Sequence, residues 1–147
     1  MHNPKYIIEE IKSLIITGTD INSKIDNSNH LLDKQIDYTL ISKYHRPIEF
    51  KILSTPNENL SLAEFLIYAG EKMNFDYVDI LFGKFNQLDK KDFITRLTEI
   101  PNDQIRGIID GVGIESSIFT IDETSSCQTF VIQAKENFYL ILENWQI

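Results

Sequence analysis

The residues of this chain that are best suited to take part in chemistry are carboxylates in its last third. Six of the eight acids there are candidates: Asp110, Glu115, Asp122, Glu123, Glu136 and Glu143. A pair among the last four could hold a metal ion or serve as the acid and base of glycoside hydrolysis. Their spacing matches no calcium-binding loop, and no histidine or asparagine can be placed beside them to complete a site. The acids therefore predict either solvated surface or a recognition surface for a basic partner, and a metal or catalytic site is the remaining alternative.

Two aromatic residues lie among the last of these acids. Tyr139 follows Glu136, and Trp145, the only tryptophan, follows Glu143. Tyrosine and tryptophan are frequent binding hot spots because they bury a large area with little loss of side-chain entropy. Two interpretations stay open: both residues anchor a partner, or helices cover this part of the chain and Trp145 belongs to the core.

Other groups that support catalysis are few. His2, His30 and His45 are the only histidines, and their spacing excludes a metal pair on one helix face. Cys127 is the only cysteine, which excludes an internal disulfide, and its acidic surroundings disfavour a thiolate. We therefore expect no catalytic residue, no metal ion and no cofactor, and a protein that is not an enzyme.

The charge of the chain is strongly negative and unevenly distributed. It has 22 acidic and 14 basic residues, a net charge of -8. Residues 99–147 hold eight acids but only Arg106 and Lys135 as bases, so this third alone carries -6. A negative field repels phosphate, and no apolar run approaches the length of a membrane span. We therefore expect a basic protein partner, no nucleic acid and no membrane, with the oligomeric state left open.

Helical spacing of apolar residues prevails before residue 113. It predicts helices over residues 4–17, 30–44, 62–72, 76–87, 89–97 and 102–109, and one short strand over 48–53. Ser61 and Glu64 form a capping box for the helix that starts at Leu62. The apolar segment 76–87 also fits a buried strand, although we favour a helix there.

After Gly113 the period changes to two, which predicts strands over 117–122, 128–134 and 138–144. A three-residue loop over 135–137 pairs Ala134 with Phe138. This register predicts a core face formed by Phe130, Ile132, Ala134, Phe138, Leu140 and Leu142. It predicts a mixed, partly wet face formed by Thr129, Val131, Gln133, Tyr139, Ile141, Glu143 and Trp145.

The order of these elements predicts an α+β fold within a single globular domain, residues 1–147. Several N-terminal and central helices pack on a C-terminal antiparallel sheet of three to four strands. The lack of a secretory signal and of disulfides favours the cytoplasm.

In size, charge and lack of catalytic groups the chain resembles bacterial immunity proteins and antitoxins as a functional class. We expect it to neutralise a basic, nuclease-type toxin through the six acids named above, with Tyr139 and Trp145 as apolar anchors. Reversing the charge of Glu136 and Glu143 should then slow association at low salt and leave stability nearly unchanged.

Two alternatives remain. An acidic secretion chaperone has similar size and charge, and a C-terminal helix would favour it over the final strand predicted here. A small metal-dependent enzyme is the other alternative, and it requires convergent carboxylates in a pocket.

Overall fold

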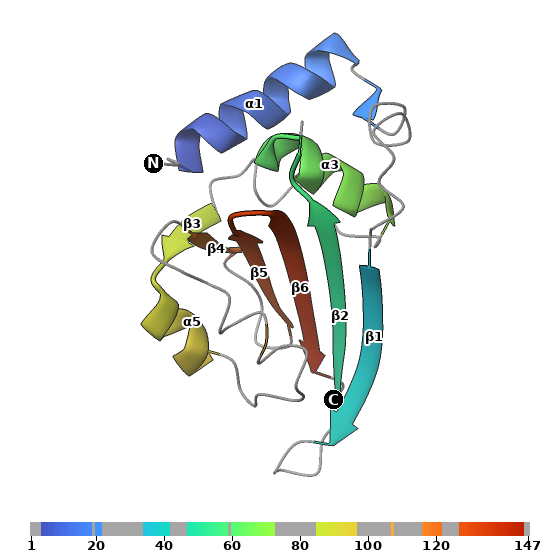
Figure 1. Ribbon diagram of the computed structural model, residues 1–147, viewed down its shortest axis with the longest axis vertical. Coiled ribbons are helices and arrows are strands. Elements are labelled where there is room, and N and C mark those ends of the chain that lie inside the picture. The colour runs from blue at the N-terminus through green and yellow to red at the C-terminus, as the bar shows by residue number, and fades with distance from the viewer. Residues whose placement is uncertain are drawn as a thin grey trace.

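A computed structural model gives the arrangement of the chain (Figure 1). It describes residues 4–18, 20–21, 34–41, 47–58, 60–72, 85–96, 107, 116–121 and 127–145. The described helices are α1 (Pro4–Thr17), α3 (Leu62–Lys72) and α5 (Lys90–Arg96). The strands are β1 (Lys34–Ile41), β2 (Pro47–Pro56), β3 (Phe85–Leu88), β4 (Ser117–Ile121), β5 (Cys127–Gln133) and β6 (Asn137–Trp145).

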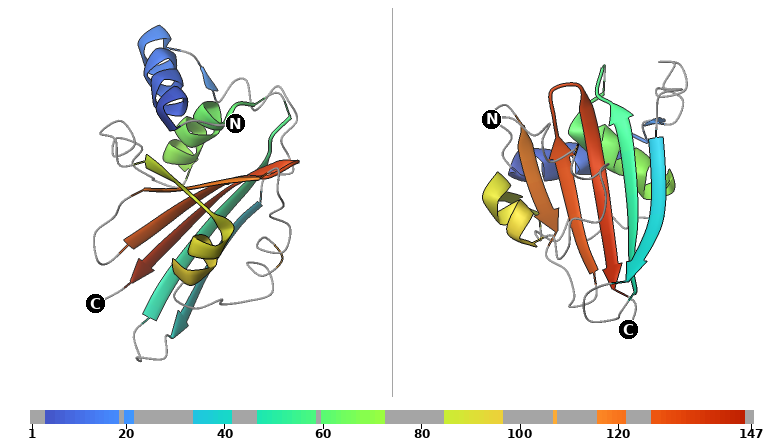
Figure 2. Two further views of the ribbon diagram at one scale, coloured as in Figure 1. Left: turned by 90° about the vertical axis from the view of Figure 1, so that its left-hand side faces the viewer. Right: turned by 60° about the horizontal axis from the view of Figure 1, so that its bottom comes forward.

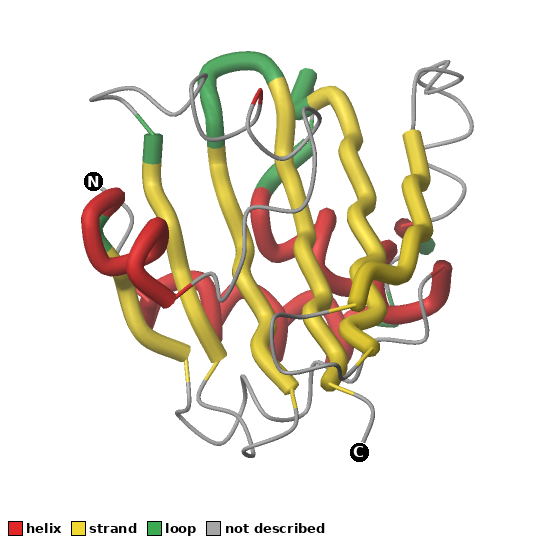
Figure 3. Tube along the Cα trace, turned by 90° about the horizontal axis from the view of Figure 1, so that it is seen from below, coloured by secondary structure: helices red, strands yellow, loops and turns green. Residues whose placement is uncertain are grey.

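These strands form one six-stranded sheet in the order β1-β2-β6-β5-β4-β3, with every neighbouring pair antiparallel. The α+β class is confirmed, whereas the expectation of three to four C-terminal strands is wrong. The last strand, β6, inserts between β5 and β2, so a hairpin from the first half of the chain completes the sheet (Figure 3). The β2–β6 pairing joins segments that are far apart in sequence.

The predicted helix over residues 30–44 is also wrong, because Lys34–Ile41 is strand β1. Ile36 and Leu40 are four residues apart, a spacing that suits a helix turn. Residues four apart also lie on the same face of a strand, where the side-chain period is two. Tyr38, midway between them, fits this alternation. In the structure Ile36 pairs with Ile52 and Tyr38 with Phe50.

The β5–β6 hairpin differs from its prediction by one residue. The amide of Ala134 donates to the carbonyl of Asn137 at 2.9 Å, so the loop has two residues, Lys135 and Glu136. Gln133 consequently pairs with Phe138. A slip of one residue moves every side chain of a strand to the opposite face relative to its partner. The predicted division into a core face and a partly wet face is therefore wrong.

Each face of the sheet instead carries a cluster of buried apolar residues. We call the side covered by α1 and α3 the helix face and the opposite side, which α5 contacts, the α5 face (Figure 2). The sheet residues buried on the helix face are Leu53, Phe119, Ile121, Val131, Phe138 and Leu140. Those buried on the α5 face are Phe50, Ile52, Ile118, Phe130, Ile132 and Ile141.

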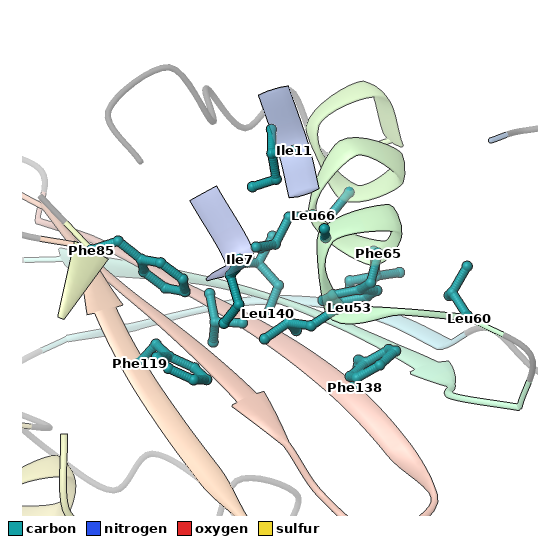
Figure 4. Close-up of a cluster of buried hydrophobic side chains, with 14 of the residues drawn as sticks. Ile7, Ile11, Leu53, Leu60, Phe65, Leu66, Phe85, Phe119, Phe138 and Leu140 are labelled. Atoms are coloured by element: carbon teal, nitrogen blue, oxygen red, sulfur yellow. The ribbon is translucent and has the colours of Figure 1, made fainter. Parts of the chain in front are cut away.

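Helix α1 packs mainly on α3 and also contacts the edge strand β3 of the sheet (Figure 2). Its buried residues Ile7 and Ile11 point toward Leu66 of α3 and the sheet below (Figure 4). Gly18 ends the helix with a φ of 65°, as expected from its position, and its amide donates to the carbonyl of Ile15 at 3.2 Å. The local signals of this helix were therefore sufficient to predict it.

The capping box at the start of α3 is confirmed. The amide of Ser61 donates to Oε1 of Glu64 at 2.9 Å, and the amide of Glu64 donates to Oγ of Ser61 at 3.2 Å. The same hydroxyl donates to Oε2 of Glu10 at 2.8 Å, which ties α1 to the first turn of α3.

Asp89 caps α5, the helix predicted over 89–97, because its Oδ1 accepts from the amide of Asp92 at 2.7 Å. Phe93 of this helix meets Phe130 edge-on, with ring centroids 5.1 Å apart. The segment 76–87, for which we favour a helix, contains the start of strand β3 instead, and its residues 76–84 lie outside the described residues. The helix expected over 102–109 also lies outside them, apart from the helical residue Gly107.

Candidate functional site

The predicted site residues fall into two groups. Asp110, Glu115, Asp122 and Glu123 lie outside the described residues. Glu136, Tyr139, Glu143 and Trp145 all lie on the β5–β6 hairpin, but the structure does not bring them together on one exposed surface.

Glu136 lies at the hairpin tip and is exposed together with Lys135. The tip is held by Asn57, which directly follows β2. The side-chain Nδ2 of Asn57 donates to the carbonyls of Ala134 and Lys135, both at 3.1 Å. Its backbone amide donates to the carbonyl of Glu136 at 3.0 Å. These three hydrogen bonds fasten the loop to the end of β2.

Asn57 also connects the tip to α3, since its carbonyl accepts from the amide of Leu60 at 3.2 Å. Glu58, the next residue, is exposed beside the tip. We define the hairpin-tip site as Asn57, Glu58, Lys135 and Glu136. Its carboxylates can make charge-assisted hydrogen bonds to lysine or arginine, which are the stronger class of hydrogen bond.

Asn57 and Glu58 were not among the residues predicted from the sequence. The run Pro56-Asn57-Glu58 has turn-forming composition, which was the only local signal. Nothing in the sequence showed that this turn meets residues almost 80 positions later, at a separation of 77 and 78 residues.

Replacing Asn57 with alanine should lower the free energy of unfolding by about 1–3 kcal/mol, because two hydrogen bonds are lost and two carbonyls lose their donor. Urea denaturation measures this change. Asn57→Asp is a matched control of equal size: it turns a carboxylate toward the same carbonyls and should be at least as destabilising. A loss below about 0.5 kcal/mol in Asn57→Ala would show that Asn57 does not hold the tip.

Glu143 does not belong to an accessible surface, because it is only 1 % exposed. It faces Phe50 on β2 and Gln128 on β5, within the sheet. The amide Nε2 of Gln128 donates to its Oε1 at 3.3 Å. The corrected register explains the burial, since β5 presents Phe130 and Ile132 on this face in place of the expected Thr129, Val131 and Gln133. A partner that approaches the folded surface therefore does not reach Glu143.

The two aromatic residues take different positions. Tyr139 is half-buried and packs against the apolar cluster of the α5 face. Trp145 ends β6, where its backbone pairs with Ile48. Trp145 is nine residues along the strand from Glu136, or about 30 Å at the rise of a β-strand. One compact partner contact cannot be centred on both residues.

Within the described ranges, the structure can be compared with the requirements of a metal site and of a membrane span. No three His, Cys, Asp or Glu side chains gather there closely enough to hold a metal ion. His45 lies outside these ranges, and the backbone of Cys127 starts β5 opposite Asn144. None of the described helices is both long and apolar enough to span a bilayer.

Compared with protein-family models, with curated proteins and with solved structures, the chain shows no significant match.

Proposed function

We propose that this protein is a non-catalytic binding protein, of the type of a bacterial immunity protein or antitoxin, that neutralises a basic and possibly nuclease toxin. The observation that carries the proposal is the hairpin-tip site: the exposed carboxylate of Glu136, on a loop that Asn57 holds in place, with exposed Glu58 beside it, in a chain of net charge -8. An enzyme that cuts nucleic acid has a cationic cleft, and carboxylates can occupy the positions of its phosphates.

The fixed conformation of the tip supports this function energetically. When a loop becomes ordered only on binding, the free energy of ordering it reduces the affinity for the partner. Asn57 supplies that order in the free protein through its bonds to Ala134, Lys135 and Glu136. The last described element is strand β6, whereas a C-terminal helix would favour the alternative of an acidic secretion chaperone.

Cell survival tests the proposal. The protein is co-expressed with the product of the gene that adjoins its own, first as wild type and then as an unfolded variant such as Phe65→Asp. We expect growth with the wild type and growth arrest with the unfolded variant. Growth arrest with both would refute neutralisation of that product.

Reversing the charge of Glu136 should slow association with the basic partner about three- to tenfold at low salt, and the difference should shrink as salt screens the charges. Glu136→Lys should leave stability within about 0.5 kcal/mol, because the side chain is exposed. Stopped-flow mixing at several salt concentrations measures the rates.

Glu9→Lys is the matched control for Glu136→Lys. Glu9 is exposed on α1, where it pairs with Lys12 at 3.6 Å, and its reversal changes the net charge by the same amount. Equal slowing by both variants would mean that total charge matters and that the tip does not.

A further inference from the structure

A hydrogen bond between side chains joins helix α1 to the start of α3. Oγ of Ser61 donates to Oε2 of Glu10 at 2.8 Å, and a bond to a carboxylate belongs to the stronger class. The same Oγ accepts from the amide of Glu64, so one hydroxyl serves both the capping box of α3 and the contact with α1. Ile7 and Ile11, on either side of Glu10 in the chain, are buried toward α3 and keep its carboxylate near Ser61 (Figure 4).

The start of α3 is joined in turn to the hairpin-tip site. Ser61 follows Leu60, whose amide donates to the carbonyl of Asn57 at 3.2 Å. The side chain of Asn57 then donates to two carbonyls of the tip. A continuous path of hydrogen bonds and short chain segments therefore runs from Glu10 on α1 to the tip.

Apolar packing provides a second connection between the same two places. Ile7 and Ile11 of α1 belong to one buried cluster with Phe65 of α3 and Phe138 of β6 (Figure 4). The ring centroids of Phe65 and Phe138 are 5.2 Å apart. Phe138 lies two residues after Glu136, which is at the tip. A change in the docking of α1 on α3 can therefore reach the tip by two routes.

We propose that α1 controls the order of the hairpin-tip site. While α1 is docked on α3, the link through Glu10 and Ser61 keeps the tip fastened, and when α1 is released the tip loosens. Two of the fourteen residues of α1 are buried, Ile7 and Ile11. An element with few buried contacts opens at a lower free energy than the whole protein, so α1 can be released while the sheet stays folded.

This control regulates the binding site of the proposed function, and its biological meaning rests on that function. A loosened tip must become ordered when it binds, which lowers the affinity for a partner. The state with α1 docked is therefore the state that binds a basic partner more tightly. Amide hydrogen exchange of the free protein detects the loosening without any partner, so failure of this control and failure of the proposed function give different results.

Exchange in the unmodified protein gives the first test. The amide of Asn57 donates to the carbonyl of Glu136 and reports on the tip, and the amide of Ile11 reports on α1. A helix of fourteen residues is marginal in water once it loses its packing, so release exposes the amide of Ile11. We expect similar protection at Asn57 and Ile11, within about threefold, and stronger protection at Val131 and Leu140 in the middle of the sheet. Protection at Asn57 as strong as at Val131 would overturn the proposal.

Ser61→Asp breaks the link between the helices and keeps the cap, because aspartate caps a helix about as well as serine. Its carboxylate has no proton to donate and would repel the carboxylate of Glu10. Exchange at Ile11 and at Asn57 should accelerate by the same factor, about five- to tenfold. Acceleration at Ile11 without acceleration at Asn57 would show that α1 opens without affecting the tip, and would overturn the proposal.

Ser61→Thr and Ser13→Asp are the controls for this variant. Ser61→Thr keeps the hydroxyl, so exchange at both amides should stay within about twofold of the parent. Ser13 is exposed on α1, and Ser13→Asp makes the same change in net charge on the same helix. It should also change exchange by less than about twofold. Equal acceleration by Ser13→Asp and Ser61→Asp would assign the effect to charge and overturn the role of the bond.

Glu10→Ala tests the same bond from α1 and leaves the capping box intact. It should accelerate exchange at Asn57 about threefold, whereas Glu10→Gln retains an oxygen that can accept from Ser61 and should restore most of the protection. Glu9→Ala is the matched control, because Glu9 is exposed on α1 and pairs with Lys12 of the same helix. Exchange at Asn57 that is unchanged in Glu10→Ala, or equal in Glu10→Ala and Glu9→Ala, would overturn the positioning role of Glu10.

Discussion

Replacing Phe138 with alanine should lower the free energy of unfolding by about 3–5 kcal/mol, the range for a large buried aromatic residue. Phe138 is 2 % exposed on the helix face, and its ring lies 5.2 Å from that of Phe65 of α3 (Figure 4). The substitution leaves a cavity between the sheet and the helix, where the neighbouring elements are fixed on all sides. In urea the midpoint should fall by about 1.5–3 M.

Tyr6→Ala is the matched control, since it also removes an aromatic ring but from a residue that is 75 % exposed. It should change stability by no more than about 0.5 kcal/mol. If Phe138→Ala were as mild as Tyr6→Ala, the hairpin would not have the register described here, because the register is what places Phe138 beneath α3.

The second large effect is expected at Glu143. Glu143→Lys should lower the free energy of unfolding by about 3–5 kcal/mol, because an unpaired buried charge is among the most destabilising groups. Glu143 is 1 % exposed and faces Phe50 and Gln128 across the sheet. The new ammonium group would also meet the Nε2 donor of Gln128 in place of an acceptor. The expectation that reversal here leaves stability nearly unchanged assumed an exposed side chain, and the burial of Glu143 contradicts that assumption.

Glu143→Gln separates charge from shape. It keeps the volume and an oxygen that can accept from Gln128, so its stability should stay within about 1.5 kcal/mol of the parent. Chemical denaturation of both variants beside Glu136→Lys gives the comparison. A Glu143→Lys variant as stable as Glu136→Lys would contradict the burial of Glu143.

Features that depend on neighbouring residues could be predicted from the sequence. The capping box of Ser61 and Glu64, the cap at Asp89 and the helix end at Gly18 all form between residues no more than four positions apart. The predicted ends of the three C-terminal strands differ from the observed ends by no more than one residue, because alternation of apolar residues indicates a strand directly.

Features set by distant contacts could not be predicted. Strand β1 was missed because Ile36 and Leu40 fit both periods, and pairing with β2 decides between them. The hairpin register was missed because Asn57 fixes the loop from a distant part of the chain.

The candidate site shows the same division. Exposure of Glu136 followed from its place in a turn, and the structure agrees. Burial of Glu143 depends on which residues of β5 share its face, and a shift of one residue replaces the expected mixed set with Phe130 and Ile132. Glu143, which was assigned to the surface because it is charged, is therefore buried on one face of the sheet.

Binding of the purified protein to the purified product of its adjoining gene tests the central claim most directly. Surface plasmon resonance over about 50–500 mM salt gives the association rate, which the Debye length makes sensitive to exposed charges. The proposed function predicts a one-to-one complex whose association rate falls about tenfold or more across that range, and falls less in Glu136→Lys. The absence of a complex, or a rate that does not depend on salt or on Glu136, would contradict it.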